Sequence, residues 1–402
     1  MLLEGPREVG KSTLLRQLAD HLGGRLLDLD DLATRTAVTR DPATMIDGDG
    51  VVLIDEYQDA PVVLDVIKAQ LNISSRPGQF ISTGSARHES LPRAAQALTG
   101  RLQRLPHLPL TQSELTGTRP DLVRQLLDAS THASAVPTST TSREDYISLV
   151  IRGGFPIVLA AASGRARWRW IDAYVRLTLE RDVQELSKLR QAHALPLIME
   201  KAAGQSAQIL NTSRMAEAAS IDAKTARDYL RLLEAVFLLR LVPSWNRTLT
   251  TRTYARPKVH MLDTGVSAGL LRLTPEKLGR RDPVAMTEFG HLLESFVVGD
   301  LLKEVSWTGE IAGYGHWRTR DDLEVDLVLE TEDGGVIGFE VKAAARVAGS
   351  DFAGVRRLRE LLGDAFLAGV ALYTGTRSYT HEDRLHVMPI VRLWSEPTRP
   401  TT

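Results

Sequence analysis

The chain has 402 residues, and a typical domain length of about 150 residues predicts two or three domains, each with its own core. Hydrophobic residues make up 43% and charged residues 25% of the chain, a composition that argues against disorder. The net charge is −1, so any nucleic-acid surface must be a local patch. Cysteine is absent, which excludes disulfides and thiolate metal sites, and neither a signal peptide nor a long apolar run is evident. We expect a cytoplasmic protein without a membrane segment.

A glycine-rich loop near the N-terminus carries the clearest chemical signal. The segment Gly5-Pro6-Arg7-Glu8-Val9-Gly10-Lys11-Ser12-Thr13 matches the pattern G-x-x-x-x-G-K-[ST] after an apolar lead. Its glycines let successive N–H groups converge on an anion, and a helix beginning near Lys11 adds the positive end of its dipole. Lys11 would reach the β- and γ-phosphates and Ser12 would bind Mg²⁺. We predict a P-loop for ATP or GTP.

A second apolar segment ends in two carboxylates. The run from Val51 to Ile54 has the character of a buried parallel strand, and Asp55 and Glu56 follow it. Asp55 would hold Mg²⁺ through water, and Glu56 is placed to orient or deprotonate the water that attacks the γ-phosphate. An acidic pair after a strand is more often an ordinary strand end. Its position after a P-loop makes nucleotide hydrolysis the leading chemistry.

Strands and helices alternate from Leu2 to about Leu115, which predicts an α/β fold with a parallel sheet and helices on both faces. Ligands of such sheets bind at the C-terminal ends of the strands. Thr83 and Ser85 follow the strand that begins at Gln79, so they occupy the position of a γ-phosphate sensor. A turn satisfied by the two hydroxyls is the alternative.

The middle of the chain is expected to be a linker followed by helices. Residues 128–142 are rich in Ser, Thr and Ala and read as a linker. Residues Trp168 to Leu186 form a charged helical segment, whose arginines most simply face solvent. Two further helices, Thr212 to Ala219 and Ala223 to Leu239, are joined by a short polar turn with helix-turn-helix spacing.

A basic segment follows these helices. Arg247, Arg252, Arg256 and Lys258 lie among turn-forming residues, as they would in the β-wing of a winged helix. DNA contact through this wing is one interpretation. Packing between domains is the other, because helical hairpins that only pack are common.

A β-hairpin is expected in the C-terminal part. Residues Leu323 to Leu329 alternate as a strand, Glu332 to Gly335 have hairpin-turn chemistry, and Val336 to Lys342 form the return strand. A turn centred on Asp333 pairs Asp326 with Glu340. Because side chains alternate along a strand, Glu340 and Lys342 share one face.

This hairpin predicts a second carboxylate site. Asp326 and Glu340, with Glu294 from the preceding helix, offer oxygen ligands that suit Mg²⁺ or Mn²⁺. Lys342 would steer or activate a metal-bound water against a phosphodiester. The spacing matches the D-x(n)-E-x-K pattern of restriction-type nucleases. A surface charge pair on an edge strand explains the same residues equally well.

The whole chain resembles a family of prokaryotic AAA+-type ATPases, in which the ATPase domain precedes a winged-helix part and a restriction-endonuclease-like part with a PD-(D/E)xK site. The matching segments are GPREVGKSTLL (5–15), VVLIDEYQDAP (51–61), STGSAR (82–87), LTGRLQRLPHLPLTQSEL (98–115), GGFP (153–156), YVRLTLERDV (174–183), PKVHMLDTGV (257–266), EVDLVLE (324–330) and GFEVK (338–342).

The resemblance implies ATP and Mg²⁺ as ligands, with Asp55 and Glu56 acting on the metal and the water and Thr83 or Ser85 as sensor. Arg101 matches an arginine position of the family and becomes a candidate for stabilising charge at the phosphates. An ordinary strand-end arginine is the alternative. Family members carry a longer segment before the P-loop than Met1 to Glu4, so phosphate contacts are better supported than base recognition.

These observations predict four regions: an AAA+-type P-loop ATPase domain (1–127), a linker (128–142), a helical and winged-helix-like region (143–283) and a restriction-endonuclease-like domain (284–402). Two functions remain open. The first is an ATPase coupled to DNA binding or processing, with a Mg²⁺-dependent nuclease domain. The second is a nucleotide-controlled switch or adaptor whose nuclease-like domain is inactive and binds a partner. Either one is compatible with a homo-oligomer.

Overall fold

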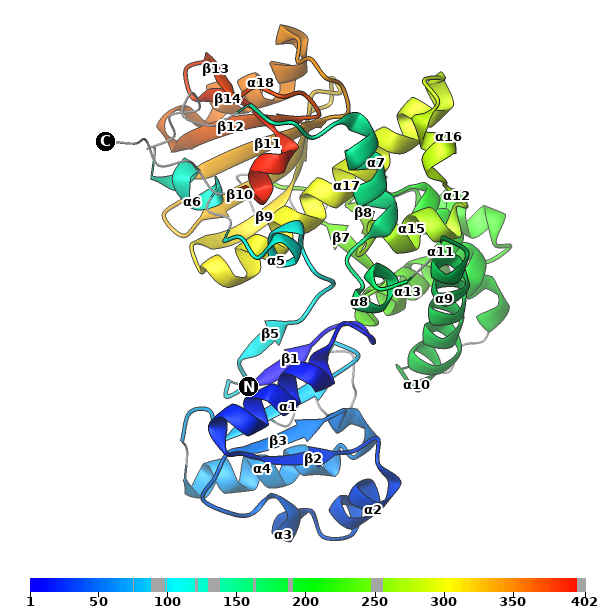
Figure 1. The fold of residues 1–402 in the computed structure, drawn as a ribbon, viewed down its shortest axis with the longest axis vertical. Helices are drawn as coiled ribbons and strands as arrows, with labels where there is room; N and C mark the ends of the chain where they lie inside the picture. Colours follow the sequence, from blue (N-terminus) through cyan, green and yellow to red (C-terminus); the bar gives the residue numbers. More distant parts are fainter. Residues whose placement is uncertain are drawn as a thin grey trace.

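The computed structural model describes residues 1–74, 76–87, 98, 100–119, 122–128, 138–161, 164–186, 191–246 and 256–395. It confirms the predicted fold class: a parallel sheet with flanking helices comes first, a helical region follows, and a mixed sheet with helices comes last. Figure 1 shows the parallel sheet at one end of the molecule and the other two parts at the opposite end.

The N-terminal sheet has the strand order β2-β3-β4-β1-β5, with parallel neighbours throughout. Its strands are β1 (Leu2–Glu4), β2 (Arg25–Asp28), β3 (Val52–Asp55), β4 (Phe80–Gly84) and β5 (Arg104–Pro106). The helices of this part are α1 (Lys11–Leu22), α2 (Leu32–Arg40), α3 (Pro42–Ile46) and α4 (Val62–Ile73). Because β4 lies between β1 and β3, Thr83 at its end is flanked by the P-loop and the acidic pair.

The chain that follows β5 crosses to the other end of the molecule (Figure 1). Helices α5 (Gln112–Thr116) and α6 (Leu122–Leu127) pack there, and the backbone N–H of Gln112 donates to Asp300 Oδ2 at 3.1 Å. Leu122 and Val123 are fully buried in the core of the C-terminal part. The predicted ATPase domain, residues 1–127, therefore includes a final segment that packs against the C-terminal part of the chain. Residues 129–137 of the predicted linker lie outside the described residues.

The helical region surrounds its own apolar core. Its first helices are α7 (Arg143–Arg152), α8 (Pro156–Leu159), α9 (Gly164–Leu177), α10 (Val183–Leu186) and α11 (Leu195–Gly204). The helix predicted up to Leu186 is present, but a π-helical turn over Thr178–Asp182 joins α9 to α10. A π-helical turn contains one residue more than an α-helical turn, and such turns are frequent at functional sites.

The predicted pair of helices is also present. The elements are β6 (Gln208–Ile209), α12 (Thr212–Ala218), α13 (Ala223–Ala235), β7 (Leu239–Val242) and β8 (Lys258–Met261), followed by α15 (Thr264–Leu270) and α16 (Pro275–Gly279). The three strands form an antiparallel sheet in the order β6-β8-β7. The expectation that the second helix reaches Leu239 was wrong, because the chain turns at Phe237 (φ 60°) and Leu239 begins β7. A buried apolar run does not by itself distinguish helix from strand.

The C-terminal domain is a six-stranded mixed sheet between two helices. Its sheet has the order β13-β14-β12-β11-β10-β9. The elements are α17 (Pro283–Thr308), β9 (Ile311–Arg318), β10 (Glu324–Thr331), β11 (Val336–Lys342), α18 (Ala353–Leu362), β12 (Phe366–Tyr373), β13 (Tyr379–Glu382) and β14 (Leu385–Pro389). Helices α17 and α18 belong to separate apolar clusters that share strands of this sheet. Within the described part of the chain, no helix is long and apolar enough to cross a membrane.

Candidate functional site

The predicted P-loop connects β1 to α1 with the backbone shape that anion binding needs. Gly10 caps α1 in the left-handed region at φ +98°, and Glu8 also has a positive φ of 64°. Gly5 faces the backbone of His107 so closely that a Cβ atom there would lie 1.8 Å from the His107 carbonyl oxygen. Only glycine fits this position. The Nζ of Lys11 lies across the loop and donates to the carbonyls of Gly5 (3.0 Å) and Pro6 (2.8 Å).

The acidic pair lies beside this loop. Asp55 and Glu56 are 3% and 6% exposed at the end of β3, and Glu56 Oε1 is 4.0 Å from Lys11 Nζ. Burial lowers the pKa of Lys11, and the Glu56 carboxylate opposes that change. A nest of N–H groups, an ammonium and a buried acidic pair fit the phosphates of a nucleotide and a bound Mg²⁺.

Thr83 joins the two carboxylate residues. Its hydroxyl donates to Asp55 Oδ1 and accepts from the backbone N–H of Glu56 at 3.0 Å. The sequence places Thr83 as a phosphate sensor, whereas its observed contacts hold the acidic pair in position. Ser85 is similarly engaged, since its Oγ accepts from Gln58 Nε2 at 3.0 Å.

Gln58 was missed by the sequence reasoning. Its amide also donates to Glu56 Oε2, so the side chain bridges Glu56 and Ser85. The available signals were its position two residues after Glu56 and its place in the family-matching segment 51–61. This bridge orients the carboxylate that would act on water.

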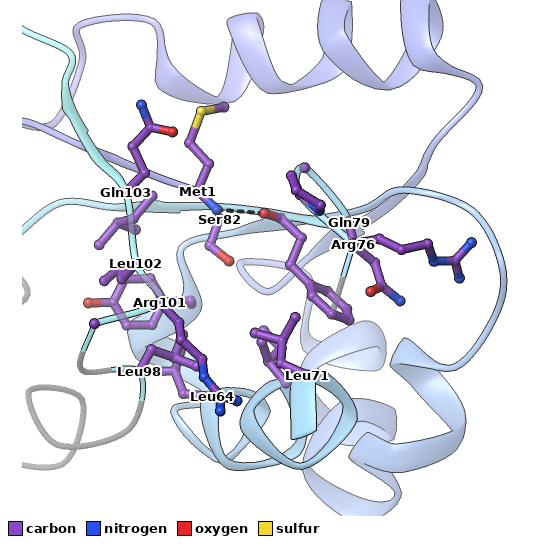
Figure 2. Close-up of a pocket in the computed structure, with 17 residues that line it drawn as sticks. Met1, Leu64, Leu71, Arg76, Gln79, Ser82, Leu98, Arg101, Leu102 and Gln103 are labelled. Atoms are coloured by element: carbon purple, nitrogen blue, oxygen red, sulfur yellow. Dashed lines mark hydrogen bonds between the residues drawn. The ribbon is translucent and has the colours of Figure 1, made fainter. Parts of the chain in front are cut away.

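Arg101 does not lie at the P-loop. It precedes β5, and its Nη1 donates to Asn72 Oδ1 at 2.6 Å. Figure 2 shows Arg101 with Met1 and Gln79 around a cavity of about 430 Å³ at the edge where β1 and β4 begin. The P-loop leaves the opposite edge, because β1, β4 and β5 run parallel. This position does not support the expectation that Arg101 stabilises charge at the phosphates.

The tip of the P-loop contacts the helical region. Arg7 Nε donates to both carboxylate oxygens of Asp182, at 2.9 and 3.1 Å, and the Asp182 side chain is 5% exposed. Val9 is 3% exposed and belongs to the same apolar cluster as Phe155 and Tyr174. Asp182 was not singled out from the sequence, because nothing local links it to a loop at the start of the chain. Two separate parts of the molecule thus meet at the nucleotide loop.

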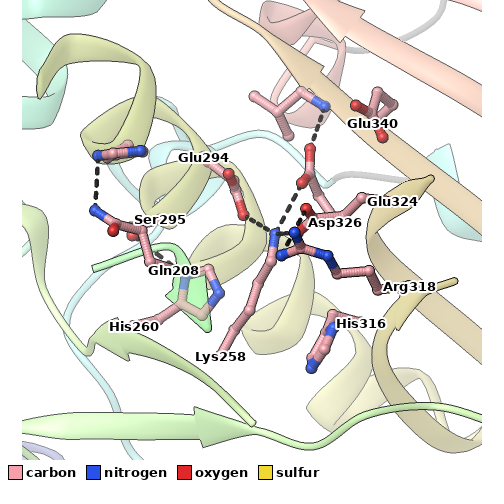
Figure 3. A network of polar contacts seen from close by, with 12 residues as sticks. Gln208, Lys258, His260, Glu294, Ser295, His316, Arg318, Glu324, Asp326 and Glu340 are labelled. Carbon is pink, nitrogen blue, oxygen red and sulfur yellow. Dashed lines mark hydrogen bonds and ion pairs between the residues drawn. The ribbon is translucent and has the colours of Figure 1, made fainter. Parts of the chain in front are cut away.

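A carboxylate cluster, formed by Glu294, Glu324, Asp326 and Glu340, lines a cavity of about 380 Å³ in the C-terminal domain. Lys258 reaches into it from β8 (Figure 3). Its Nζ lies 2.7 Å from Glu294 Oε1, 2.5 Å from Glu324 Oε1 and 2.9 Å from Asp326 Oδ1.

This position overturns the wing assignment of Lys258. The residue is 2% exposed and cannot contact DNA phosphates. Arg247 and Arg252 lie outside the described residues, so their expected DNA contacts are not placed. For Arg256, the backbone carbonyl contacts His316 Nε2 at 3.1 Å.

The predicted hairpin residues lie as expected. The register Leu327↔Phe339 continues toward Asp326 opposite Glu340, and Lys342 Nζ is 2.9 Å from Glu340 Oε1. Burial, followed by the Asp326 charge, raises the pKa of Glu340 to about 8. Glu340 Oε2 has no hydrogen-bond partner among the described residues.

The cluster does not fit a divalent cation as it stands. Asp326 Oδ1 contacts Lys258 and Oδ2 accepts from the Val341 backbone N–H at 2.9 Å, while Glu294 is bound to the same ammonium. Burial opposes the charge of Lys258, yet the surrounding carboxylates, Asp326 foremost, raise its pKa well above the ordinary value. In the part of the chain that the structure describes, no group of three His, Asp or Glu side chains is arranged to hold a metal. Two of the three predicted metal ligands, Glu294 and Asp326, are thus bound to the Lys258 ammonium, and the third, Glu340, pairs with Lys342.

Comparison with known proteins covers the three parts separately. Residues 1–116 match the family described as "AAA domain". Residues 143–277 and 289–393 match "Domain of unknown function (DUF8612)" and "Domain of unknown function (DUF4143)". Uncharacterized proteins of Mycobacterium bovis and Mycobacterium tuberculosis are each 27% identical over 391 residues, which is 97% of this chain and 79% of each relative.

Among solved structures, the chain is similar to a RuvB protein of Thermotoga maritima with a threonine-to-valine substitution. The TM-score is 0.26 at 17% identity, covering 60% of this chain and 81% of that chain, which is too low to inform fold or function. The sequence match and the geometry of the loop agree with each other. Residues 1–116 thus match the AAA domain family and contain a loop with P-loop geometry.

Proposed function

We propose that this chain is an ATP-hydrolysing switch, in which the nucleotide loop passes its state to the helical region. The observation that carries the proposal is the P-loop itself, which combines the phosphate-binding backbone with a buried acidic pair and is clasped at its tip by Asp182. A candidate nucleotide site and a contact with the helical region thus share one loop.

The placement of Lys11, Asp55 and Glu56 supports the following roles in hydrolysis. Lys11 would pair with the β- and γ-phosphates, and Ser12 and Asp55 would hold Mg²⁺. When bound, Mg²⁺ neutralises charge on the β- and γ-oxygens. Glu56, kept in place by Gln58 and by Thr83, would orient the attacking water.

The switch half depends on Arg7. A nucleotide would bring several negative charges to a loop whose arginine already pairs with Asp182. The guanidinium then faces two competing anions, so the strength of the contact with the helical region changes with the nucleotide. This mechanism needs no chemistry in the C-terminal domain.

ATP hydrolysis by the purified full-length chain tests the enzyme half. Lys11→Ala should abolish turnover, because one ammonium both holds the nucleotide and offsets charge in the transition state. Lys68→Ala, on the exposed side of α4, is the matched control and should hydrolyse ATP like the wild type. Turnover that is the same in the Lys11 variant and the wild type would end the proposal.

DNA binding is a second candidate function. A pair of helices followed by the β7–β8 hairpin supports a winged-helix interpretation, and α13 carries Lys224, Arg227 and Arg231 on its exposed side. If these residues contact phosphates, Lys224→Ala with Arg227→Ala should flatten the plot of log K against log[salt] by about 0.9 per lost contact. If the slope of log K against log[salt] is unchanged in the double variant, these residues do not contact DNA and the helices have only a structural role. Metal-dependent cleavage is not part of the proposal, because Lys258 fills the expected metal position.

A further inference from the structure

We propose that the Lys258 ammonium is the permanent cation of the carboxylate cluster. It takes the place of a divalent metal and fastens the β6-β8-β7 sheet to the C-terminal domain. This inference is independent of ATP hydrolysis, because it concerns contacts among β8, α17 and β10 and none with the P-loop.

Lys258 makes two hydrogen bonds and three ion pairs through its ammonium group. An ammonium has three N–H donors, and three carboxylates from different positions approach it, namely Glu294 on α17 and Glu324 and Asp326 on β10. Charge-assisted contacts of this length are the strong ones. The lysine therefore joins a strand of one sheet to a helix and a strand of the next domain (Figure 3).

The backbone of Lys258 is as constrained as its side chain. The residue lies on the middle strand of its sheet, opposite Ile209 on β6 and Val242 on β7. With 2% of its surface exposed, the residue is almost fully withdrawn from solvent. The Lys258 ammonium is covalently part of the chain, so it does not exchange with ions in solution as a bound metal ion would.

A divalent metal would have to displace this ammonium. Doing so would leave a buried lysine without its partners, and the loss of a partner from a buried ion pair is strongly destabilising. Removing the positive charge should have the opposite effect on metal binding. Glu294, Glu324 and Asp326 would then lack their shared cation, and oxygen ligands of this kind suit Mn²⁺.

The test measures Mn²⁺ binding to the nucleotide-free, full-length protein. Binding is monitored as a decrease in the electron paramagnetic resonance signal of free Mn²⁺. The wild type should leave the signal of free Mn²⁺ unchanged. Lys258→Met keeps a long apolar stem without the charge and should gain one bound Mn²⁺ per chain. Adding Asp326→Asn to that variant should remove the new site. Lys201→Met, at an exposed lysine of α11, should behave like the wild type.

Lys258→Arg covers the case in which the methionine variant does not fold, as judged by circular dichroism. It keeps the positive charge and should fold and leave Mn²⁺ free. Mn²⁺ bound by the wild type and lost in Asp326→Asn alone would overturn the proposal. So would a folded Lys258→Met protein that binds no Mn²⁺.

Discussion

Arg7 in the P-loop and Asp182 in the π-helical turn form an ion pair, in which the Arg7 Nε lies 2.9 and 3.1 Å from the two carboxylate oxygens of Asp182. This pair ties the nucleotide loop to a region 175 residues further along the chain. In the proposed switch, this pair would transmit a change at the phosphates to the helices.

Asp182→Asn should weaken this tie without touching the phosphate-binding backbone. Asparagine keeps the size of the side chain but loses its charge, and a hydrogen bond to a charged partner is worth about 2 kcal/mol. We expect lower stability in urea unfolding, with retained ATP binding. Glu180→Gln, an exposed neighbour in the same turn, is the control and should unfold like the wild type. A loss of ATP binding in Asp182→Asn would mean that the residue belongs to the nucleotide site itself.

Glu56→Gln should separate binding from hydrolysis. The amide keeps the side chain near Gln58 but cannot orient or accept a proton from water, so turnover should fall by roughly 10²-fold or more. ATP binding, measured by calorimetry, should persist. Loss of binding in step with turnover would assign Glu56 a structural role.

Thr83→Val should slow turnover with little change in the KM for ATP. The valine fills the same volume but leaves Asp55 Oδ1 without its hydroxyl donor and the Glu56 N–H without its acceptor. Each unsatisfied buried group typically costs about 1–3 kcal/mol. Thr83→Ser restores the hydroxyl and should recover activity. If valine raises KM alone, Thr83 contacts the nucleotide and does not act through the acidic pair.

His260 should make the protein less stable in mild acid. Burial, followed by the Lys258 charge, lowers the pKa of His260 from 6.5 to about 3, and Asp326, His316 and Arg240 also face it. Between these pH values the folded histidine is neutral while the unfolded one takes a proton. The free energy of unfolding therefore falls as the pH drops below about 6.5, by about 1.4 kcal/mol per unit.

Urea unfolding at pH 7 and pH 5 measures this effect of His260. The wild type should lose about 2 kcal/mol more than His260→Asn over that interval. Glu340 affects stability in the opposite direction: because its pKa is raised to about 8, its contribution to the free energy of unfolding falls as the pH rises above 4.5. Both proteins contain Glu340, so its effect cancels when they are compared. Equal losses in the two proteins would show that His260 is not held neutral.

The sequence predicted those features that depend on residues close together in the chain. Gly5, Gly10 and Lys11 signal a P-loop by spacing alone, and an apolar strand ending in Asp55 marks the acidic pair. The hairpin of Asp326 and Glu340 follows from turn chemistry and strand alternation.

What escaped prediction depends on contacts between distant segments. Lys258 is 36 residues from Glu294 and 68 from Asp326, so its sequence neighbours suggested an exposed wing while the fold buries it. Arg101 was misplaced because a short motif does not say which edge of a sheet it will occupy. Asp182 meets Arg7 only after two separate parts of the molecule pack together.

The most direct test of the switch is hydrogen–deuterium exchange of full-length Glu56→Gln protein with and without ATP. This variant should hold ATP without consuming it. We predict that ATP changes amide exchange in the segment from α9 to α10, and that adding Asp182→Asn abolishes this change while ATP stays bound. Identical exchange in that segment with and without bound ATP would contradict the account.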